Sequence, residues 1–245
     1  HERFFIRSLS KIAYLYSEMI NANAVLFGNQ NELLKFNECE HPLAIQLGGN
    51  DPIKLSEAAT ISESYGYDEI NLNVGCPSSR VQAGRFGACL MKEPELVGQC
   101  FEMMQKRVEI PVTIKCRIGV DSHDKFEDLY RFVQCLSSVG CQTFVIHARK
   151  AWMRGLSPKQ NREIPPLDYE SVYRLKRELD QLEIIVNGGI CSLDETFNHL
   201  ISTDGVMVGR EAYRNPSILR SVDRKLFGAE APDTSILDVL ELYNI

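Results

Sequence analysis

The chain has 245 residues, of which 44% are hydrophobic and 24% charged, and its formal net charge is −6. This is the composition of a globular protein, and no apolar run approaches the ~20 residues that cross a bilayer. The acidic balance argues against a general nucleic-acid coat but allows a local basic patch. Because the first residues are too polar for a signal peptide, we expect a soluble, cytoplasmic protein without a membrane partner.

Short β-rich runs alternate with longer segments of helical spacing along the chain. After a helix at 3–11, strands are expected at 13–17, 42–47, 69–74, 112–117, 143–147, 183–187 and 205–208. The intervening helices are expected at 52–65, 93–107, 125–139, 169–179 and 192–200, and a last one at 234–243. This alternation predicts a parallel sheet with right-handed crossovers.

Seven strands fit either an open sheet or a barrel that lacks one strand. Polar or glycine-rich clusters follow nearly every strand, and only in a barrel do all these ends converge on one mouth. We therefore predict an α/β fold, a (β/α)8 TIM barrel whose first strand is missing, over residues 1–220. Residues 221–245 are expected to begin a C-terminal helical domain, so that both ends look cut.

Two glycine-containing loops follow the last two predicted strands. They contain Asn187, Gly188 and Gly189 in the first and Gly209 and Arg210 in the second. Loops at these positions of a barrel commonly bind phosphate, because glycine lets backbone N–H groups approach the oxygens and arginine adds a charged fork. The two loops together predict a phosphate-bearing cofactor.

Gln46, Lys115 and His147 end other strands and are expected to face the same mouth. An amide, an ammonium and an imidazole suit the polar edge of a flavin ring. The alternative is that Lys115 pairs with a nearby carboxylate and His147 is a satisfied core residue. Taken jointly, the three residues favour the flavin.

One of the eight cysteines, Cys76, lies just past the predicted strand at 69–74, between Gly75 and Pro77. No cysteine pair has the spacing of a zinc site, so no metal is expected. Without an adjacent histidine, the Cys76 thiol suits a proton donor better than a nucleophile, and hydride transfer to a C=C bond needs such an acid. The following segment, 79–88, is either a surface loop or a lid.

A basic strip follows the fifth predicted strand and surrounds the single tryptophan, Trp152. Its members are Arg149, Lys150, Arg154, Lys159 and Arg162, with no acidic residue among them. Basic residues around an aromatic ring form a platform for RNA phosphates and bases, although a charge run is often only a solvated face. Its place at the predicted mouth favours the RNA platform.

The sequence resembles the dihydrouridine synthases, specifically the A subfamily that acts on the D-loop of tRNA. The matching stretches are QLGGNDP, DEINLNVGCPSSRVQAGRFGACLM, VTIKCRIGVD, FVIHARKAWMRGLSPKQNREIPPLDY, IVNGGI and DGVMVGREAYRNP. The resemblance implies a monomeric, FMN-containing barrel with a helical tRNA-binding domain and NADPH as reductant. Uridine would be reduced to 5,6-dihydrouridine by hydride transfer from flavin N5 to C6 and proton transfer from Cys76 to C5.

The resemblance also assigns the remaining site residues. It implies that Gln46, Lys115 and His147 contact the flavin ring, and that Asn187, Gly188, Gly189, Gly209 and Arg210 form the phosphate loops. Asn73 would lie near the target base, and Arg149, Lys150 and Arg162 would contact tRNA.

Three departures from the family pattern stand out. The opening strand and most of the helical domain are absent, and Cys116 stands where a histidine is expected. We therefore expect the isolated chain to bind FMN weakly or not at all. Two other functions stay open: a flavin-dependent reductase or dehydrogenase of a free pyrimidine, and a truncated, non-catalytic relative that binds tRNA.

Overall fold

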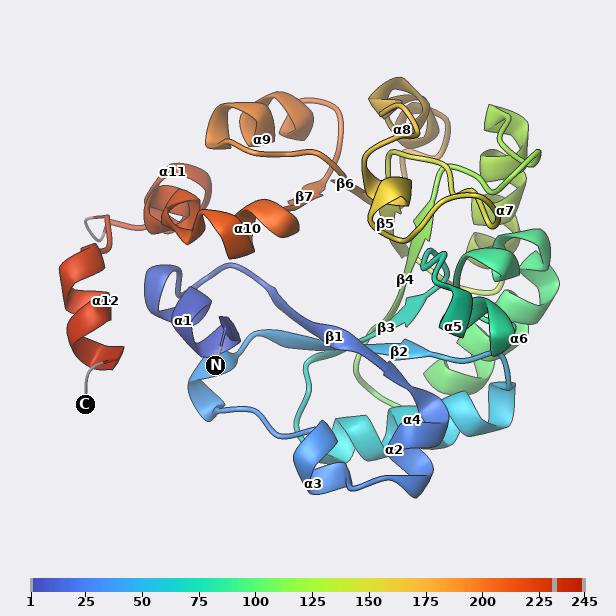
Figure 1. Ribbon diagram of the computed structural model, residues 1–245, viewed down its shortest axis with the longest axis horizontal. Helices are drawn as coiled ribbons and strands as arrows, with labels where there is room; N and C mark the ends of the chain where they lie inside the picture. Colours follow the sequence, from blue (N-terminus) through green and yellow to red (C-terminus); the bar gives the residue numbers. More distant parts are fainter. Residues whose placement is uncertain (1, 231–232, 244–245) are drawn as a thin grey trace.

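A seven-stranded parallel sheet forms the centre of the computed structural model, which describes residues 2–230 and 233–243 (Figure 1). Each strand pairs with the next one along the chain, from β1 to β7. The strands are β1 (Leu15–Asn21), β2 (Leu43–Gly48), β3 (Glu69–Asn73), β4 (Val112–Arg117), β5 (Thr143–His147), β6 (Glu183–Asn187) and β7 (Gly205–Met207). All seven predicted strands are therefore present, in the predicted order.

The predicted helices lie on the outer side of the curved sheet (Figure 1). They are α4 (Pro52–Ser64), α6 (Pro94–Gln105), α7 (Phe126–Ser138), α8 (Tyr169–Glu178) and α9 (Leu193–Leu200). Local chemistry sets their starts: Asp51 accepts hydrogen bonds from the N–H groups of Ile53 and Lys54 before α4. A helix after each inner strand, packed outside a curved parallel sheet, is the TIM-barrel-like architecture that the sequence predicts.

The strands present different chemistry to their two sides. On β3, Ile70 and Leu72 are fully buried in the apolar core with residues of the outer helices. Alternation along the strand turns Glu69, Asn71 and Asn73 to the opposite face, inside the barrel. The barrel interior is therefore polar, unlike the layers of branched aliphatic residues that usually fill it.

Several short elements lie outside the residue ranges of the predicted helices and strands. They are α2 (Ala22–Phe27), α3 (Gln30–Leu33), η1 (Glu38–Glu40), α5 (Ser79–Ala83), η2 (Gly87–Lys92), η3 (Gln160–Arg162), α10 (Arg210–Arg214), η4 (Pro216–Ser221) and α11 (Val222–Phe227). All are six residues or shorter, which is too short for hydrophobic periodicity to reveal them.

A second, smaller apolar cluster joins the two ends of the described chain. It packs Leu9 at the end of α1 (Glu2–Leu9) against Leu219, Val222 and Val239, the last of which belongs to α12 (Ile236–Tyr243). Figure 1 shows α1 and α11 on the open side of the sheet, beside its two edge strands. Among the described residues β1 and β7 do not pair with each other, so helices rather than a strand occupy this side. The predicted domain boundary after residue 220 remains a prediction.

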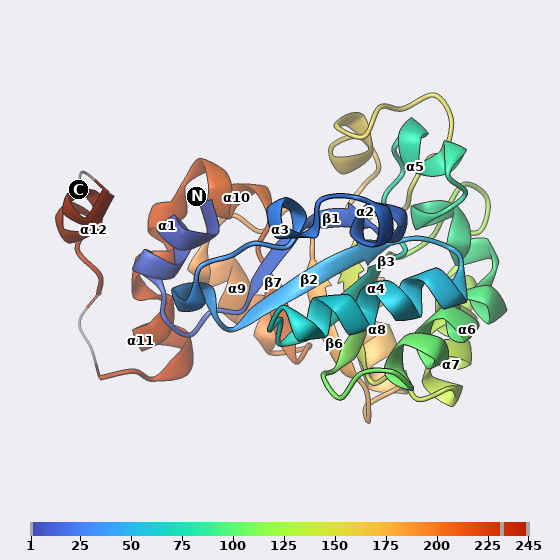
Figure 2. The same cartoon turned by 90° about the horizontal axis from the view of Figure 1, so that it is seen from below.

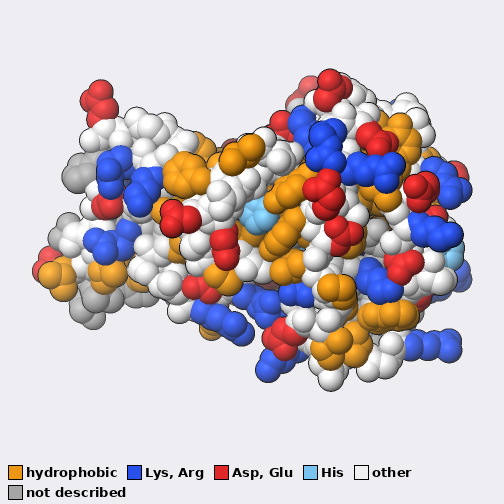
Figure 3. Space-filling view, turned by 90° about the horizontal axis from the view of Figure 1, so that it is seen from above, with side chains coloured by type: hydrophobic (Ala, Val, Ile, Leu, Met, Phe, Trp, Pro, Cys, Tyr) orange, Lys and Arg blue, Asp and Glu red, His pale blue; other side chains and the backbone are white. Residues whose placement is uncertain are grey.

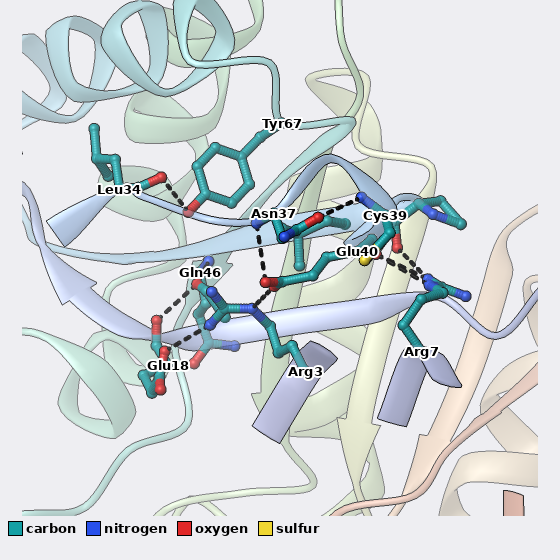
Figure 4. Close-up of polar contacts among 12 residues, drawn as sticks. Arg3, Arg7, Glu18, Leu34, Asn37, Cys39, Glu40, Gln46 and Tyr67 are labelled. Atoms are coloured by element: carbon teal, nitrogen blue, oxygen red, sulfur yellow. Dashed lines mark hydrogen bonds and ion pairs between the residues drawn. The ribbon is translucent and has the colours of Figure 1, made fainter. Parts of the chain in front are cut away.

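Arginines of α1 hold the helix to the segment before β2 (Figure 4). The Arg3 guanidinium lies 2.6 Å from a carboxylate oxygen of Glu40 and 3.1 Å from one of Glu18. Arg7 is buried and donates to the Glu40 carbonyl. These contacts fix the start of the chain against η1 and β1.

The surface carries charges of both signs. Figure 3 shows acidic and basic side chains interspersed over the face seen from above, with a shallow hollow between a smaller and a larger part of the molecule. Of the helices in the described part of the chain, none combines the length and apolar character that crossing a bilayer requires.

Candidate active site

A cleft of about 270 Å³ opens at the C-terminal ends of the strands. Ten predicted site residues line it: Asn73, Cys76, Lys115, His147, Arg162, Asn187, Gly188, Gly189, Gly209 and Arg210. A larger groove of about 640 Å³ lies on the outside, among η2, α6 and α7, and contains none of the predicted residues. The smaller cleft is therefore the candidate active site.

Three predicted residues lie outside the cleft lining. Gln46 is one hydrogen bond away, since its Oε1 accepts from Asn73 Nδ2 at 2.7 Å. Lys150 forms an ion pair with Asp124, and its ammonium lies 4.2 Å from the centre of the Trp152 ring. Arg149, the third, donates to the carbonyl oxygens of residues in the loop after β5. Part of the basic strip therefore forms contacts within the protein that stabilise its own loop.

The backbone around Cys76 is held by side-chain and backbone contacts. Asn73 Oδ1 accepts from the N–H groups of Gly75 at 3.1 Å and Cys76 at 2.9 Å. The Cys76 carbonyl accepts from Ala88 N at 2.9 Å. Gly87 has φ +73°, and a Cβ there would lie 2.6 Å from the Cys76 carbonyl oxygen. The half-buried thiol, with its sulfur 3.6 Å from Ser78 Oγ, is thereby presented to the cleft.

Arg117 lines the cleft but is not among the predicted site residues. It is only 3% exposed, and it donates to the carbonyls of Gly75 at 2.8 Å, Lys150 at 3.2 Å and Asn161 at 3.1 Å. Burial lowers the pKa of Arg117 to about 10, and nearby arginines add to this effect. Strand alternation could have found it, because Arg117 follows Lys115 on the same face of β4.

Lys115 and His147 lie in a buried, positively charged environment. Burial, followed by the charge of Arg117, lowers the pKa of Lys115 to about 8. Its ammonium donates to Asn187 Oδ1 at 3.3 Å, and no ion pair with a carboxylate forms within the described ranges. Burial, followed by the charges of Arg117 and Lys115, lowers the pKa of His147 to about 2. His147 is therefore a neutral imidazole at pH 7.

The adjacent glycines after β6 occupy conformations that side chains would not tolerate. Gly188 has φ +116° and Gly189 φ +74°. A Cβ at position 188 would lie 2.5 Å from His147 Cδ2, and one at 189 would lie 2.6 Å from Leu167 Cδ1. The Tyr169 hydroxyl donates to the Gly188 carbonyl at 2.5 Å, which fixes the turn. The loop is shaped so that backbone groups, not side chains, face the cleft.

Positive charge exceeds negative charge around the second loop. Arg210 pairs with Glu163 at 3.1 Å and donates to the Arg162 carbonyl at 3.1 Å. The Nε atoms of Arg149 and Arg162 are buried and have no hydrogen-bond partner among the described residues. Buried donors without acceptors are uncommon in proteins and call for an external acceptor. An anionic ligand, such as a phosphate group, fits this arrangement.

Two loops meet above the cleft, on the same side of the sheet in Figure 2. The first contains α5, whose Gln82 donates from Nε2 to the carbonyls of Pro77 and Met153, both at 2.8 Å. The second contains Trp152 and is organised by Asn161, which is fully buried and binds the Trp152 backbone N–H at 2.8 Å. The segment after Cys76 is thus tied to the basic strip.

Cys116, which replaces an expected histidine, is a core residue. Its side chain is fully buried, and burial raises the pKa of its thiol to about 12. The replacement therefore places a neutral thiol next to Lys115.

Comparisons with known proteins show which family the chain is similar to. The family model described as dihydrouridine synthase matches residues 1–243. A tRNA-dihydrouridine(20/20a) synthase of Synechocystis is 56% identical over 93% of this chain and 68% of its own length. The proteins of that name from Shewanella oneidensis and Escherichia coli K12 are 56% and 54% identical, over 94% and 98% of this chain and 68% and 70% of their own lengths.

The fold also has a distant structural counterpart. The crystal structure of a suggested lyase/mutase from Burkholderia cenocepacia J2315 aligns with a TM-score of 0.55 and 11% identity, covering 100% of this chain and 87% of that one. At this identity the likeness concerns the fold alone.

Proposed function

Because the chain belongs to the dihydrouridine synthase family, we propose that it reduces uridine to 5,6-dihydrouridine in the D-loop of tRNA, with FMN as cofactor and NADPH as reductant. The observation that carries the proposal is the position of Cys76, whose thiol lines the cleft that also contains Lys115, His147 and the glycine loops. An acid therefore lies in the same cavity as the groups suited to a flavin.

The predicted cofactor residues divide into those for the ring and those for the phosphate. Gln46, Lys115 and His147 would hold the polar edge of the flavin; a charged Lys115 and a neutral His147 provide one positive charge and one uncharged polar group there. The backbone of Asn187, Gly188, Gly189 and Gly209, with the Arg210 guanidinium, would hold the phosphate. When bound, FMN supplies the hydride that adds to C6 of the uracil.

Cys76 completes the reduction by giving its proton to C5 of the same ring. Asn73 serves this step through its hold on the Cys76 backbone, and its side chain lines the cleft where the base would lie. The target uridine would be turned out of its stack to enter the cleft. Arg149, Lys150 and Arg162 lie on the loop above it, where tRNA phosphates would pass.

Replacing Cys76 tests the assignment most directly. We expect Cys76→Ala to abolish dihydrouridine formation, measured by mass spectrometry of digested tRNA, while its affinity for FMN stays equal to that of the unchanged chain. Cys39→Ala removes an exposed thiol outside the cleft and serves as the matched control. Undiminished activity in Cys76→Ala would refute the proton-donor role. Turnover of free uracil without tRNA would refute tRNA as the substrate.

A further inference from the structure

A continuous row of side-chain hydrogen bonds crosses the barrel interior beneath Cys76. Asn73 Nδ2 donates to Gln46 Oε1 at 2.7 Å, and Gln46 Nε2 donates to Asn71 Oδ1 at 2.8 Å. Asn71 Nδ2 then donates to Thr113 Oγ1 at 2.8 Å, and the Thr113 hydroxyl donates to Glu69 Oε1 at 2.6 Å. We refer to these five residues, Glu69, Thr113, Asn71, Gln46 and Asn73, as the amide relay.

Sheet register explains why these side chains meet. Asn71 pairs with Gln46 of β2 on one side and with Thr113 of β4 on the other. Glu69 and Asn73 lie two residues before and after Asn71, so that all three point into the barrel. The relay therefore runs from the N-terminal end of β3 to the mouth.

Every donor in the relay points away from the mouth and toward Glu69. At the upper end, the backbone N–H groups of Gly75 and Cys76 can only donate, and Asn73 turns its oxygen to them and its NH₂ to Gln46. At the lower end, an ionised carboxylate can only accept. Reversing any one amide between these ends would place donor against donor, so the two ends together select one orientation.

Glu69 is a buried carboxylate that has no cationic partner among the described residues. It is 8% exposed, and its only other side-chain hydrogen bond among the described residues comes from the Tyr16 hydroxyl at 3.0 Å. Within the same residues it forms no ion pair, and burial raises the pKa of its carboxyl group. A carboxylate that is buried without a cation costs stability, which suggests that its charge serves another purpose.

We propose that Glu69 is a positioning residue for Cys76, because its carboxylate ends the amide relay and so fixes the Asn73 oxygen that holds the Cys76 backbone. This inference rests on the proposed role of Cys76 as the proton donor. Glu69 itself touches neither substrate nor cofactor, and its effect reaches the thiol through the orientation of three amides.

Two substitutions each remove one hydroxyl that donates to Glu69 Oε1. Comparing them distinguishes an effect on the position of Cys76 from a general loss of stability. Thr113→Val interrupts the relay with little change of shape, whereas Tyr16→Phe removes the other hydrogen bond to Glu69 Oε1 and leaves the relay intact. We expect Thr113→Val to slow the reoxidation of reduced flavin by tRNA on the order of 10- to 100-fold, the cost of a displaced reacting group. Flavin reduction by NADPH should be unchanged in both variants, and Tyr16→Phe should match the wild type throughout.

A second readout follows the thiol itself and needs no turnover. The rate at which iodoacetamide modifies Cys76, relative to exposed Cys39 in the same sample, should rise several-fold in Thr113→Val and stay unchanged in Tyr16→Phe. Glu69→Gln, which keeps the shape but removes the charge, should fall between them. Equal alkylation ratios in Thr113→Val and Tyr16→Phe would overturn the positioning role. A wild type without tRNA-dependent activity would instead overturn the proposed function, while the alkylation ratios would still decide whether the relay positions the thiol.

Discussion

Replacing Lys115 by methionine is expected to make the ligand-free protein more stable and its affinity for FMN lower. The folded state lowers the pKa of Lys115 from 10.5 to about 8, which corresponds to about 3 kcal/mol of unfavourable free energy for the charged form. Loss of the hydrogen bond to Asn187 offsets about 1 kcal/mol of the gain. A net increase of about 2 kcal/mol in the free energy of unfolding remains.

Urea unfolding at pH 7 without FMN measures this change, and titration with FMN measures the loss of affinity. Lys176→Met is the matched control, because the Lys176 ammonium lies 2.8 Å from an Asp204 carboxylate oxygen. Removing a lysine from this partly exposed ion pair should lower stability by up to about 1 kcal/mol. The two Lys→Met substitutions should therefore shift the unfolding midpoint in opposite directions.

The stability difference should also depend on pH. Between pH 8 and 10.5 the unfolded chain binds more protons at Lys115 than the folded state does, so this group makes the wild type more stable as pH rises. Below pH 8 the cost of the charge is fully present. The advantage of Lys115→Met should accordingly be largest near pH 7 and shrink toward pH 10. A variant that is less stable at pH 7, or whose advantage does not change with pH, would refute this reasoning.

Three further substitutions test other parts of the structure. Gly188→Ala should lower both stability, by about 2 kcal/mol, and FMN affinity, because its Cβ would lie 2.5 Å from His147 Cδ2; urea unfolding and flavin titration check this. Arg3→Met should cost about 3 kcal/mol by leaving the Glu40 carboxylate buried without its cation, and adding Glu40→Gln should recover part of that loss in a double-mutant cycle. Arg162→Gln should weaken tRNA binding and reduce its salt dependence by about one phosphate contact, with FMN affinity unchanged, in filter-binding assays at several salt concentrations.

The strand and helix order was predictable because buried strands and amphipathic helices leave strong patterns. The predicted helix at 192–200 begins one residue before α9 (Leu193–Leu200) and ends with it. The first strand was predicted at 13–17 and is wrong in its bounds, since β1 spans Leu15–Asn21. Its second half is set by pairing with β2 up to Asn21 and Gly48, and the exposed Glu18 interrupts the apolar pattern there. Pairing at a sheet edge is not visible in local sequence.

The candidate site was predictable as far as strand ends define it. Parallel strands bring their C-terminal residues together, which is why Lys115, His147 and Asn187 meet as expected. The partners of the loops could not be foreseen, because Lys150 pairs with Asp124 across 26 residues of sequence. The amide relay was hidden for a similar reason: its members lie on three strands, and only register joins them.

Because one side of the sheet is open, its strands are expected to differ in local stability. The central strands β3 to β5, which carry Asn73 and Lys115, are bonded on both edges, whereas β1 and β7 have one partner each among the described residues. Local opening should therefore cost least at this seam, where the cluster around Leu9 and Val222 provides the contact. A ligand that reaches from Lys115 to the Arg210 loop after β7 would connect a central strand with an edge strand. Its binding free energy would then stabilise the contact between the two edge strands and leave the strand that carries Asn73 unchanged.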